Sequence, residues 1–552
     1  MTMLYSAFAR GDHPPPQPSP ARGEGAEEVL AITRFIVEER DRFEVETPLL
    51  VVSLFDEDEL DESFVRLDQA LGGAIRRMKA SGEISGKPRT VTIITTAALL
   101  GDSSSALRAE RVAIIGRGKR QDLNLETIRT VAAVGASKAR ELRLSRFAIA
   151  PFGIAFGGYD PHEVGQAIAE GALLALYRYE RFKSDNGDST QEIEQISVVP
   201  ARHQITASGI RAGVADGEKL AAATITARDL ATGPANLVTA TYLGERAQEL
   251  ASRYGFSAQI FGKSDLEEMG CGGILAVNQG SAEPPAMGVL RYDCERPGAK
   301  TLAAVGKGIT FDTGGISIKP AEGMHYMRHD KSGACAVIGF MQAAAALKLP
   351  INVLGVFAAT DNMPSGSAYR PGDVIRSYSG KYMEILNTDA EGRVVLADAL
   401  AYSVEQQPDA IVDLATLTGA CVVALGHVAS GLFSNDDALA NSLLAAGDSS
   451  GERLWRMPLW KEYHEQIKAP LGDIKNTGGR PAGSITAAWF LADFVGDVPW
   501  AHLDTAGTAW AEGSWAVLPP YIQKDLATGV GVRLLTYFAR AWATSQSDAA
   551  AS

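Results

Sequence analysis

Cysteine is scarce in this chain. Its 552 residues contain four cysteines, Cys271, Cys294, Cys335 and Cys421. No two of them have the spacing of a zinc finger or of a dithiol redox motif. We therefore expect small buried thiols in a reducing compartment, and we take that compartment to be the cytoplasm. The scarcity of cysteine argues against a fold that depends on disulfide bonds.

Long apolar runs and an excess of positive charge are also missing. No stretch has the length of about 20 apolar residues that a membrane-spanning helix needs, and the N-terminus has no apolar signal core. The formal net charge is −14, which argues against a protein that binds nucleic acid through its overall charge, although a local basic face stays compatible with it. We expect no membrane partner, and nucleic acid is a disfavoured one.

The length is sufficient for more than one domain, and the composition, 46% hydrophobic and 21% charged, is that of a globular protein. Residues 1–27 are predicted to be disordered, because five prolines fall between Pro14 and Pro20 and no apolar periodicity is present. The remaining chain is divided into these segments: an N-terminal domain at 28–190, a linker at 191–217, a larger domain at 218–545 and a disordered tail at 546–552.

Both domains are predicted to be α/β. In the first, short β-branched runs predict strands, and amphipathic stretches such as Phe64–Met78 and Leu125–Leu142 predict helices. Strands are expected at Leu49–Leu54, Val91–Thr95, Arg111–Ile115 and Arg146–Ala150. In the second, strands, loops and helices alternate, which predicts a central mixed sheet flanked by helices on both faces. Its strands are expected at Gly288–Tyr292, Thr301–Val305, Ile351–Ala358, Ala410–Leu414 and Ala501–Leu503, and its helices at Glu218–Leu230, Tyr242–Tyr254, Gly333–Leu347 and Val394–Val404.

The segment Asn387–Arg393 places two acids, Asp389 and Glu391, two residues apart. On an extended backbone their side chains leave on the same side. Two close carboxylates repel each other unless a cation lies between them, and hard divalent metal ions prefer carboxylate oxygens. By itself the segment is equally compatible with a solvated acidic loop.

Two further segments carry chemically useful residues. Val305–Pro320 follows a predicted strand and combines Lys307, Asp312 and Lys319 with glycines that let the chain surround a small ligand. Met324–Ala334 contains Asp330 directly before the alanine-rich helix. Reactive groups of α/β sheets gather in such loops after the carboxyl ends of strands.

These three segments, in this order, resemble the leucyl aminopeptidase family of dinuclear-metal exopeptidases, whose signature is Asn-Thr-Asp-Ala-Glu-Gly-Arg. The resemblance continues in Arg370–Asp373, Thr416–Ala420 and Gly478–Gly483. It covers the chain from about Glu218 onward, whereas the first 185 residues match poorly and share only the two-domain layout. It implies a hydrolase that removes the N-terminal residue, with leucine-like side chains preferred, from peptide substrates.

The resemblance also implies a role for each residue that matches the family. The implied metal ligands are Lys307, Asp312, Asp330, Asp389 and Glu391, and the implied catalytic pair is Lys319 and Arg393. Implied substrate contacts are Met327, Asn387, Thr416 and Gly419, and implied bicarbonate contacts are Gly392, Arg393 and Leu417. Two divalent ions per subunit, Mn²⁺ or Zn²⁺ with Mg²⁺ or Co²⁺ as possible substitutes, one bicarbonate and a homohexamer complete the expectation.

Elementary electrostatics agrees with this assignment. Four carboxylates carry four negative charges, which two divalent ions neutralise. A water between the ions becomes acidic enough to attack the peptide carbonyl. Lys307 can bind a metal only as the free amine, and adjacent dications lower its pKa in that direction. Lys319 can stay charged and stabilise the oxyanion that forms.

Several residues have a competing interpretation. His325 and His329 have half of a helical zinc motif's spacing, but no glutamate follows His325, and a packing role is favoured. His427, His464 and His502 are isolated in the sequence and are expected to be structural. Lys331 stands where members of the family often carry methionine, and its charge beside Asp330 bears on metal affinity.

Two rival functions remain open from sequence. Regulatory DNA binding, alone or in addition to hydrolysis, is one, and the net charge of −14 weighs against it. A degenerate site kept for structure is the other, and it fits badly because every expected ligand is present.

Overall fold

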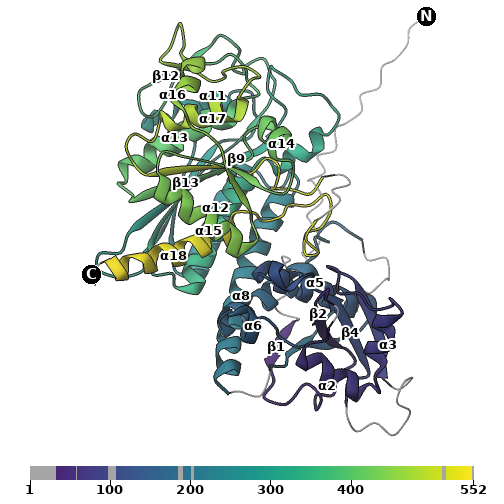
Figure 1. The fold of residues 1–552 in the computed structure, drawn as a ribbon. Coiled ribbons are helices and arrows are strands. Elements are labelled where there is room, and N and C mark those ends of the chain that lie inside the picture. Colours follow the sequence, from purple (N-terminus) through teal and green to yellow (C-terminus); the bar gives the residue numbers. More distant parts are fainter. Residues whose placement is uncertain are drawn as a thin grey trace, which may run out of the picture.

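The computed structural model describes residues 33–57, 59–96, 107–184, 191–200, 204–512 and 518–549. These residues form two α/β lobes, and the long helix α8 (Gln204–Thr232) runs from one lobe to the other (Figure 1). The extension predicted at 1–27 lies outside the described residues. The predicted tail begins within helix α18 (Val532–Ala549), because that helix continues to Ala549.

The N-terminal lobe contains a six-stranded sheet, which is parallel except for the antiparallel pair of β3 and β4. Its strand order is β1 (Arg34–Val37), β6 (Gln195–Val198), β5 (Arg146–Ile149), β2 (Leu50–Leu54), β4 (Arg111–Gly116) and β3 (Val91–Thr95). The strands predicted from sequence here are confirmed, and β1 and β6 are additional.

Helices cover both faces of this sheet because successive strand residues point to opposite sides. Val51 packs in the core shared with α5 (Leu125–Glu141) and α7 (Pro161–Leu176). Its neighbours Leu50 and Val52 pack in the core shared with α2 (Glu62–Ala70) and α3 (Ala74–Ala80). One helix was predicted over Phe64–Met78, which is wrong: Gly72 and Gly73 have φ of 61° and 77° and separate α2 from α3.

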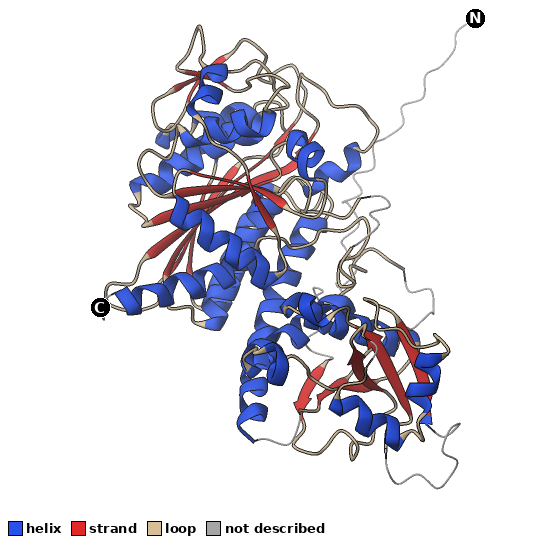
Figure 2. Ribbon diagram, in the orientation of Figure 1, coloured by secondary structure: helices blue, strands red, loops and turns tan. Residues whose placement is uncertain are grey.

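The C-terminal lobe contains an eight-stranded mixed sheet, shown in red at the centre of that lobe in Figure 2. Its order is β15 (Leu454–Arg456), β14 (Ser430–Ser434), β17 (Trp500–Asp504), β13 (Ala410–Ala415), β9 (Thr301–Asp312), β10 (Asn352–Asn362), β8 (Ala286–Tyr292) and β7 (Ser257–Phe261). The four central strands, β17, β13, β9 and β10, are parallel. The predicted mixed sheet is confirmed, and all five of its predicted strands are present.

Two apolar cores lie on the two faces of this sheet. One is shared with α8, α9 (Ala240–Tyr254), α12 (Ser332–Leu347), α15 (Asp437–Ser450) and α18. The other is shared with α11 (Gly272–Asn278), α13 (Glu391–Glu405) and α17 (Gly483–Ala492). A small sheet of β11 (Val374–Arg376), β12 (Tyr382–Glu384) and β16 (Ile474–Lys475) lies beside the second core.

The segment predicted as a linker, 191–217, contains β6 and the first half of α8. Gly209, Gly213 and Gly217 fall four residues apart in that half. They lie where α8 crosses α7: a Cβ on Gly213 would be 1.9 Å from the carbonyl oxygen of His162, so only glycine permits this approach. The domain boundaries therefore remain a prediction. None of the described helices is long and apolar enough to cross a membrane.

Candidate metal centre

The candidate site lies at the carboxyl ends of the central parallel strands. β9 ends at Asp312 and β10 ends at Asn362, while β13 leads into Thr416. Because parallel strands present their carboxyl ends at one edge of a sheet, these residues come together there although they are far apart in sequence.

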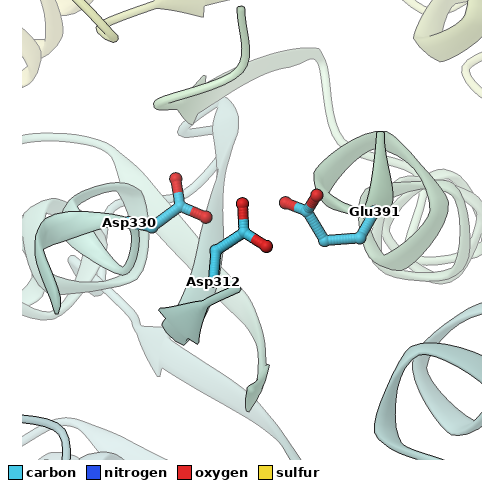
Figure 3. Close-up of side chains that lie close together, drawn as sticks. All are labelled: Asp312, Asp330 and Glu391. Atoms are coloured by element: carbon cyan, nitrogen blue, oxygen red, sulfur yellow. The ribbon is translucent and has the colours of Figure 1, made fainter. Parts of the chain in front are cut away.

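Three buried acids converge at this edge. Asp312 ends β9, Asp330 lies between the short helix η3 (Met324–His329) and α12, and Glu391 is the first residue of α13. Their carboxylate oxygens lie within 4.8 Å of one another. Figure 3 shows the three carboxylates facing a common space from three different elements. Three carboxylate oxygens this close together are a suitable set of ligands for a divalent metal ion.

Two lysines lie against the acids. The Nζ of Lys307 is 2.8 Å from Oδ2 of Asp330 and 2.9 Å from Oε1 of Glu391, and it donates to the carbonyl oxygen of Thr416 at 3.0 Å. The Nζ of Lys319 is 2.8 Å from Oδ2 of Asp312 and also pairs with Asp389. All five residues predicted as metal ligands are thus brought together, with Lys319 beside them.

The extended backbone expected at Asp389–Glu391 is not observed. Ala390 has φ −115° and ψ 42°, and the helix begins at Glu391. The two carboxylates consequently face different lysines, Asp389 toward Lys319 and Glu391 toward Lys307. The prediction from alternation was wrong because alternation applies to strands, and this segment is the junction of a turn and a helix.

Gly392, an implied bicarbonate contact, is the second residue of α13. A Cβ on Gly392 would be 2.6 Å from both Cε and Nζ of Lys307. Real Cβ atoms do not approach other heavy atoms so closely. A side chain at residue 392 would therefore displace the end of the Lys307 side chain, which crosses directly over the first turn of α13.

The pKa values of the four acids are shifted by burial and by the neighbouring charges. Burial raises the pKa of Asp330 to about 8 and that of Asp389 to about 6, even though a lysine contacts each. Burial and the charge of Glu391 also raise the pKa of Asp312. Burial alone would raise the pKa of Glu391, but the charges of Lys307 and Lys319 lower it.

Lys307 and Lys319 are ammonium groups in this environment. Burial lowers the pKa of Lys307, but the charges of Asp330 and Glu391 more than offset it and raise the pKa. Burial likewise lowers the pKa of Lys319, and Asp312, Glu391 and Asp389 raise it. The neutral amine expected for Lys307 requires dications close by; carboxylate neighbours favour the charged form.

The net charge of the cluster favours the binding of metal cations. With all four carboxylates ionised, four negative charges face the two positive charges of the ammonium groups, so two negative charges remain. The high pKa of Asp330 has this excess as one of its causes, since Glu391 and Asp312 both raise it. Oxygen ligands without histidine suit several divalent ions, among them Mn²⁺, Mg²⁺ and Zn²⁺.

Arg393 lies on α13 two residues after Glu391. Its Nη1 donates to the carbonyl oxygen of Asn476 at 2.9 Å. Its Nε is buried and has no hydrogen-bond partner among the described residues, and burial lowers its pKa to about 10. A buried guanidinium with an unused donor is suited to a small anion. The Leu417 amide, expected to contact that anion, donates instead to Oδ1 of Asp504 at 3.1 Å.

The residues predicted to contact substrate lie around the acids. Met327 is on η3 and is half-buried, and Gly419 is the exposed first residue of α14 (Gly419–Leu425). Thr416 donates through Oγ1 to Oδ1 of Asp330 at 2.6 Å, so its hydroxyl orients an acid. Asn387 accepts the Asp389 amide at 2.9 Å, which shapes the turn before α13.

Sequence reasoning missed residues that hold these acids in place. Asn362 donates to Oδ1 of Asp312 at 2.9 Å and to the carbonyl oxygen of Thr388 at 3.0 Å. The Tyr369 hydroxyl donates to the same carbonyl at 2.9 Å. The buried carboxylate of Asp504 accepts from the Thr418 hydroxyl at 2.6 Å as well as from the Leu417 amide. Asn362 was predicted only as a residue after a strand, and no local signal distinguished it.

The histidines have the structural roles expected of them. His329 is buried, its Nδ1 lies 3.1 Å from the carbonyl oxygen of Ala231, and its ring stacks on Trp510. Burial lowers its pKa to about 2, so it is neutral. His502 is buried beside Asp413, with Nδ1 2.6 Å from Oδ1.

Lys331 does not point at the acids. Its Nζ donates to the carbonyl oxygen of Gly233 at 2.9 Å and to that of Arg328. Burial lowers its pKa to about 8. The side chain therefore joins the start of α12 to the end of α8.

Comparison with protein families identifies both lobes. The profile described as "Cytosol aminopeptidase family, catalytic domain" matches residues 225–536, and the profile of the same family's N-terminal domain matches residues 51–186. The resemblance inferred from the motifs is thus confirmed, and it extends into the first lobe, where no motif indicated it.

Individual relatives are similar in sequence to this chain over most of its length. A probable cytosol aminopeptidase of Roseiflexus castenholzii is 45% identical over 511 residues, covering 92% of this chain and 99% of the relative. One from Geobacter sp. strain M21 is 44% identical over 494 residues, covering 90% and 97%. Among solved structures, tomato leucine aminopeptidase, as a mutant, has a TM-score of 0.79 at 30% identity, covering 92% of this chain and 96% of that one. The bottromycin maturation enzyme BotP in complex with Mn has a TM-score of 0.76 at 33% identity, covering 90% and 100%.

Proposed function

This chain belongs to the cytosol aminopeptidase family and is a metal-dependent aminopeptidase, and from that premise we propose that it releases leucine-like N-terminal residues from peptides at a two-metal centre. The observation that carries the proposal is the convergence of Asp312, Asp330 and Glu391 on one buried space. Asp389 and Lys307 complete the ligand set. The Mn-bound structure of BotP supports Mn²⁺ as one suitable ion.

Two divalent ions held by these residues would polarise the peptide carbonyl and acidify a water between them. The protein fixes the carboxylates in advance. Asn362 and the Gly314 amide both donate to Oδ1 of Asp312, at 2.9 Å and 2.8 Å, and Thr416 donates to Asp330. Ligands oriented in this way need little rearrangement when they bind an ion.

Lys319 is proposed to stabilise negative charge on the carbonyl oxygen of the scissile bond. It stays an ammonium because the neighbouring acids raise its pKa. Its side chain is also 22% exposed, whereas that of Lys307 is 3% exposed. Lys319 can therefore be reached by substrate, which a donor to the reacting oxygen must be.

Arg393 is proposed to hold a bicarbonate ion, which would supply a base near the attacking water. The unused Nε of Arg393 supports this role, and Gly392, next to it, leaves backbone close to the acids. Leu417 contributes less than expected, since Asp504 already accepts its amide.

The preference for leucine-like residues is proposed from the pocket composition. Met327 offers an apolar wall on η3, and no atom lies within 4 Å of where a Cβ on Gly419 would be. An apolar side chain with branched carbons gains free energy by leaving water in such a pocket.

The decisive experiment replaces Glu391 by glutamine, which keeps its size and removes its charge. Hydrolysis of leucine p-nitroanilide with added Mn²⁺ should fall by at least a hundredfold while the thermal midpoint changes little. Glu405→Gln, on the exposed end of the same helix, is the control and should keep full activity. Undiminished hydrolysis by Glu391→Gln would refute the assignment.

Assembly and location are proposed from the family alone. We expect a homohexamer and a cytoplasmic location, in keeping with the relatives called cytosol aminopeptidases. Multi-angle light scattering measures the assembly directly. A monomer at working concentration would remove the hexamer from the proposal.

A further inference from the structure

The helix η3 is held from outside the metal centre by the segment 518–528, which we call the strap. The Tyr326 hydroxyl donates to Oδ1 of Asp525 at 2.7 Å, and Nη2 of Arg328 donates to the carbonyl oxygen of Asp525 at 3.0 Å. These two residues flank Met327, the proposed pocket wall. Movement of Asp525 would therefore move that wall.

The strap is attached to the N-terminal lobe. Nη1 of Arg89 donates to the carbonyl oxygen of Leu518 at 2.5 Å. The Tyr521 hydroxyl donates to Oε1 of Glu126 on α5 at 2.7 Å. Gln523 donates to the carbonyl oxygen of Tyr177, which ends α7. One segment thus contacts α5 and α7 on one side and η3 on the other.

Helix α8 makes a second connection between the lobes and η3. Its buried Arg228 donates to the carbonyl oxygens of Thr528 at 2.9 Å and Tyr521 at 3.0 Å, which fixes the strap at two points. The carbonyl oxygens at the end of α8 accept from η3 and the residues after it. His329 contacts Ala231, and Lys331 contacts Gly233.

We propose that the N-terminal lobe positions η3 through the strap and α8, and so sets the pocket wall that selects the first substrate residue. Tyr326, Asp525 and Gln523 are then positioning residues for selectivity, although none contacts the metal ligands. The effect on substrate selectivity rests on the proposed function. The connection between the N-terminal lobe and η3 rests on the hydrogen bonds described above. It gives Lys331 a role as a tether between α8 and the segment that carries Asp330.

Selectivity provides the first test. Tyr326→Phe removes one hydroxyl, and a lost hydrogen bond changes an equilibrium by about threefold to tenfold. The ratio of kcat/KM for leucine over alanine p-nitroanilide should fall by that factor, because alanine is too short to depend on the wall. Gln523→Ala, at the lobe contact, should lower the same ratio. Arg66→Ala, which breaks the ion pair of the exposed Arg66 with the largely buried Asp41 in the same lobe, should leave it unchanged.

A double variant tests whether the two ends act as one connection. Tyr326→Phe combined with Gln523→Ala should give less than the product of the single effects, since either change releases the same strap. Multiplicative effects would overturn the proposal. So would an unchanged ratio in both single variants, or an equal loss on leucine and alanine substrates.

Amide hydrogen exchange provides a readout that does not depend on activity. In Gln523→Ala, the peptide covering residues 323–330 should exchange severalfold faster than in the parent protein, and in Arg66→Ala it should not. Unchanged exchange in that peptide would overturn the proposal. If the parent protein hydrolysed no aminoacyl anilide, the proposed function would fail, while this exchange result would still decide the inference.

Discussion

Gly392 illustrates how little space the candidate centre leaves around a single residue. Lys307 passes over the first turn of α13 at a distance that no side chain on residue 392 can share. The position of the Lys307 amine, a proposed metal ligand, thus depends on the absence of a Cβ.

Gly392→Ala should therefore displace Lys307 and weaken metal binding. We expect Mn²⁺ affinity, measured by isothermal titration calorimetry, to fall by at least tenfold, as for changes that reorient a ligand. The thermal midpoint should change little, because alanine favours a helix by about 1 kcal/mol over glycine. Gly366→Ala is a matched control, since a Cβ there meets no atom within 4 Å. Equal Mn²⁺ affinity in both variants would contradict this account of Gly392.

Asp330 and Asp389 predict a pH dependence of metal binding. Their pKa values, raised to about 8 and about 6, mean that both carry protons in part of the range between pH 6 and 8. Because a metal ion displaces those protons, Mn²⁺ affinity should increase as pH rises from 6 to 8. Calorimetry in two buffers with different ionisation enthalpies measures the protons released. Affinity that is constant over this range would count against protonated ligands.

The same shift has the opposite effect on the metal-free protein. The pKa of Asp330 is above its ordinary value of 3.8, so the folded state binds this proton more tightly than the unfolded state does. Its contribution to the free energy of unfolding is fully present below about pH 4 and is lost as pH rises through 8. Asp330→Asn in metal-free protein should flatten that decline, which thermal unfolding at several pH values would show.

At the scale of elements, the crossing of α7 and α8 connects the two lobes. Gly209, Gly213 and Gly217 form the contact surface of α8, and a Cβ on each would lie under 3 Å from α7. The close approach brings backbone against backbone along the crossing.

Gly213→Ala should destabilise the protein although alanine is the better helix former. Overpacking costs about 3 kcal/mol or more, against a gain of about 1 kcal/mol from helix propensity. Urea unfolding should thus show a net loss of about 2 kcal/mol. Ala212→Gly, on the exposed side of the same turn, should lower the free energy of unfolding only by the difference in helix propensity, about 1 kcal/mol. A Gly213→Ala protein more stable than its parent would disprove the packing argument.

At the scale of the whole molecule, a buried charged network joins the lobes. Nε of Arg129 on α5 lies 2.6 Å from Oε2 of Glu170 on α7, and Nη2 donates to the Tyr537 hydroxyl on α18 at 2.6 Å. Both charged side chains are fully buried. The relative position of the lobes is therefore specified by directional contacts as well as by apolar area.

Arg129→Met should be costly because it leaves Glu170 buried without its nearest cation. We expect a loss of about 3–5 kcal/mol in the free energy of unfolding, and partial recovery in the double variant with Glu170→Gln. Arg108→Ala, which breaks an exposed pair with Glu46, should cost under about 1 kcal/mol. Equal losses in Arg129→Met and Arg108→Ala, measured by urea unfolding, would show that the network contributes no more than a surface pair.

The sequence by itself determined the type of fold and the members of the site. β-branched runs fixed strands such as β3, whose predicted and observed bounds coincide, because a strand's pattern is local. The motifs named Lys307, Asp312, Asp330, Asp389 and Glu391, since residue types with a chemical role recur in a recognisable order. Nothing local marked Asn362 as a partner of Asp312 or Asp504 as a partner of Thr418, because each acts on a residue distant in sequence.

Only the tertiary structure decided how these parts meet. It showed the first half of α8 within the predicted linker, where Gly209, Gly213 and Gly217 contact α7. It showed Asp389 and Glu391 facing different lysines. It also revealed that the first lobe reaches η3 through the strap. Sequence periodicity indicates which side of an element is buried, but it does not indicate which other element covers that side. Both the candidate metal centre and the connection between the lobes depend on those contacts between elements.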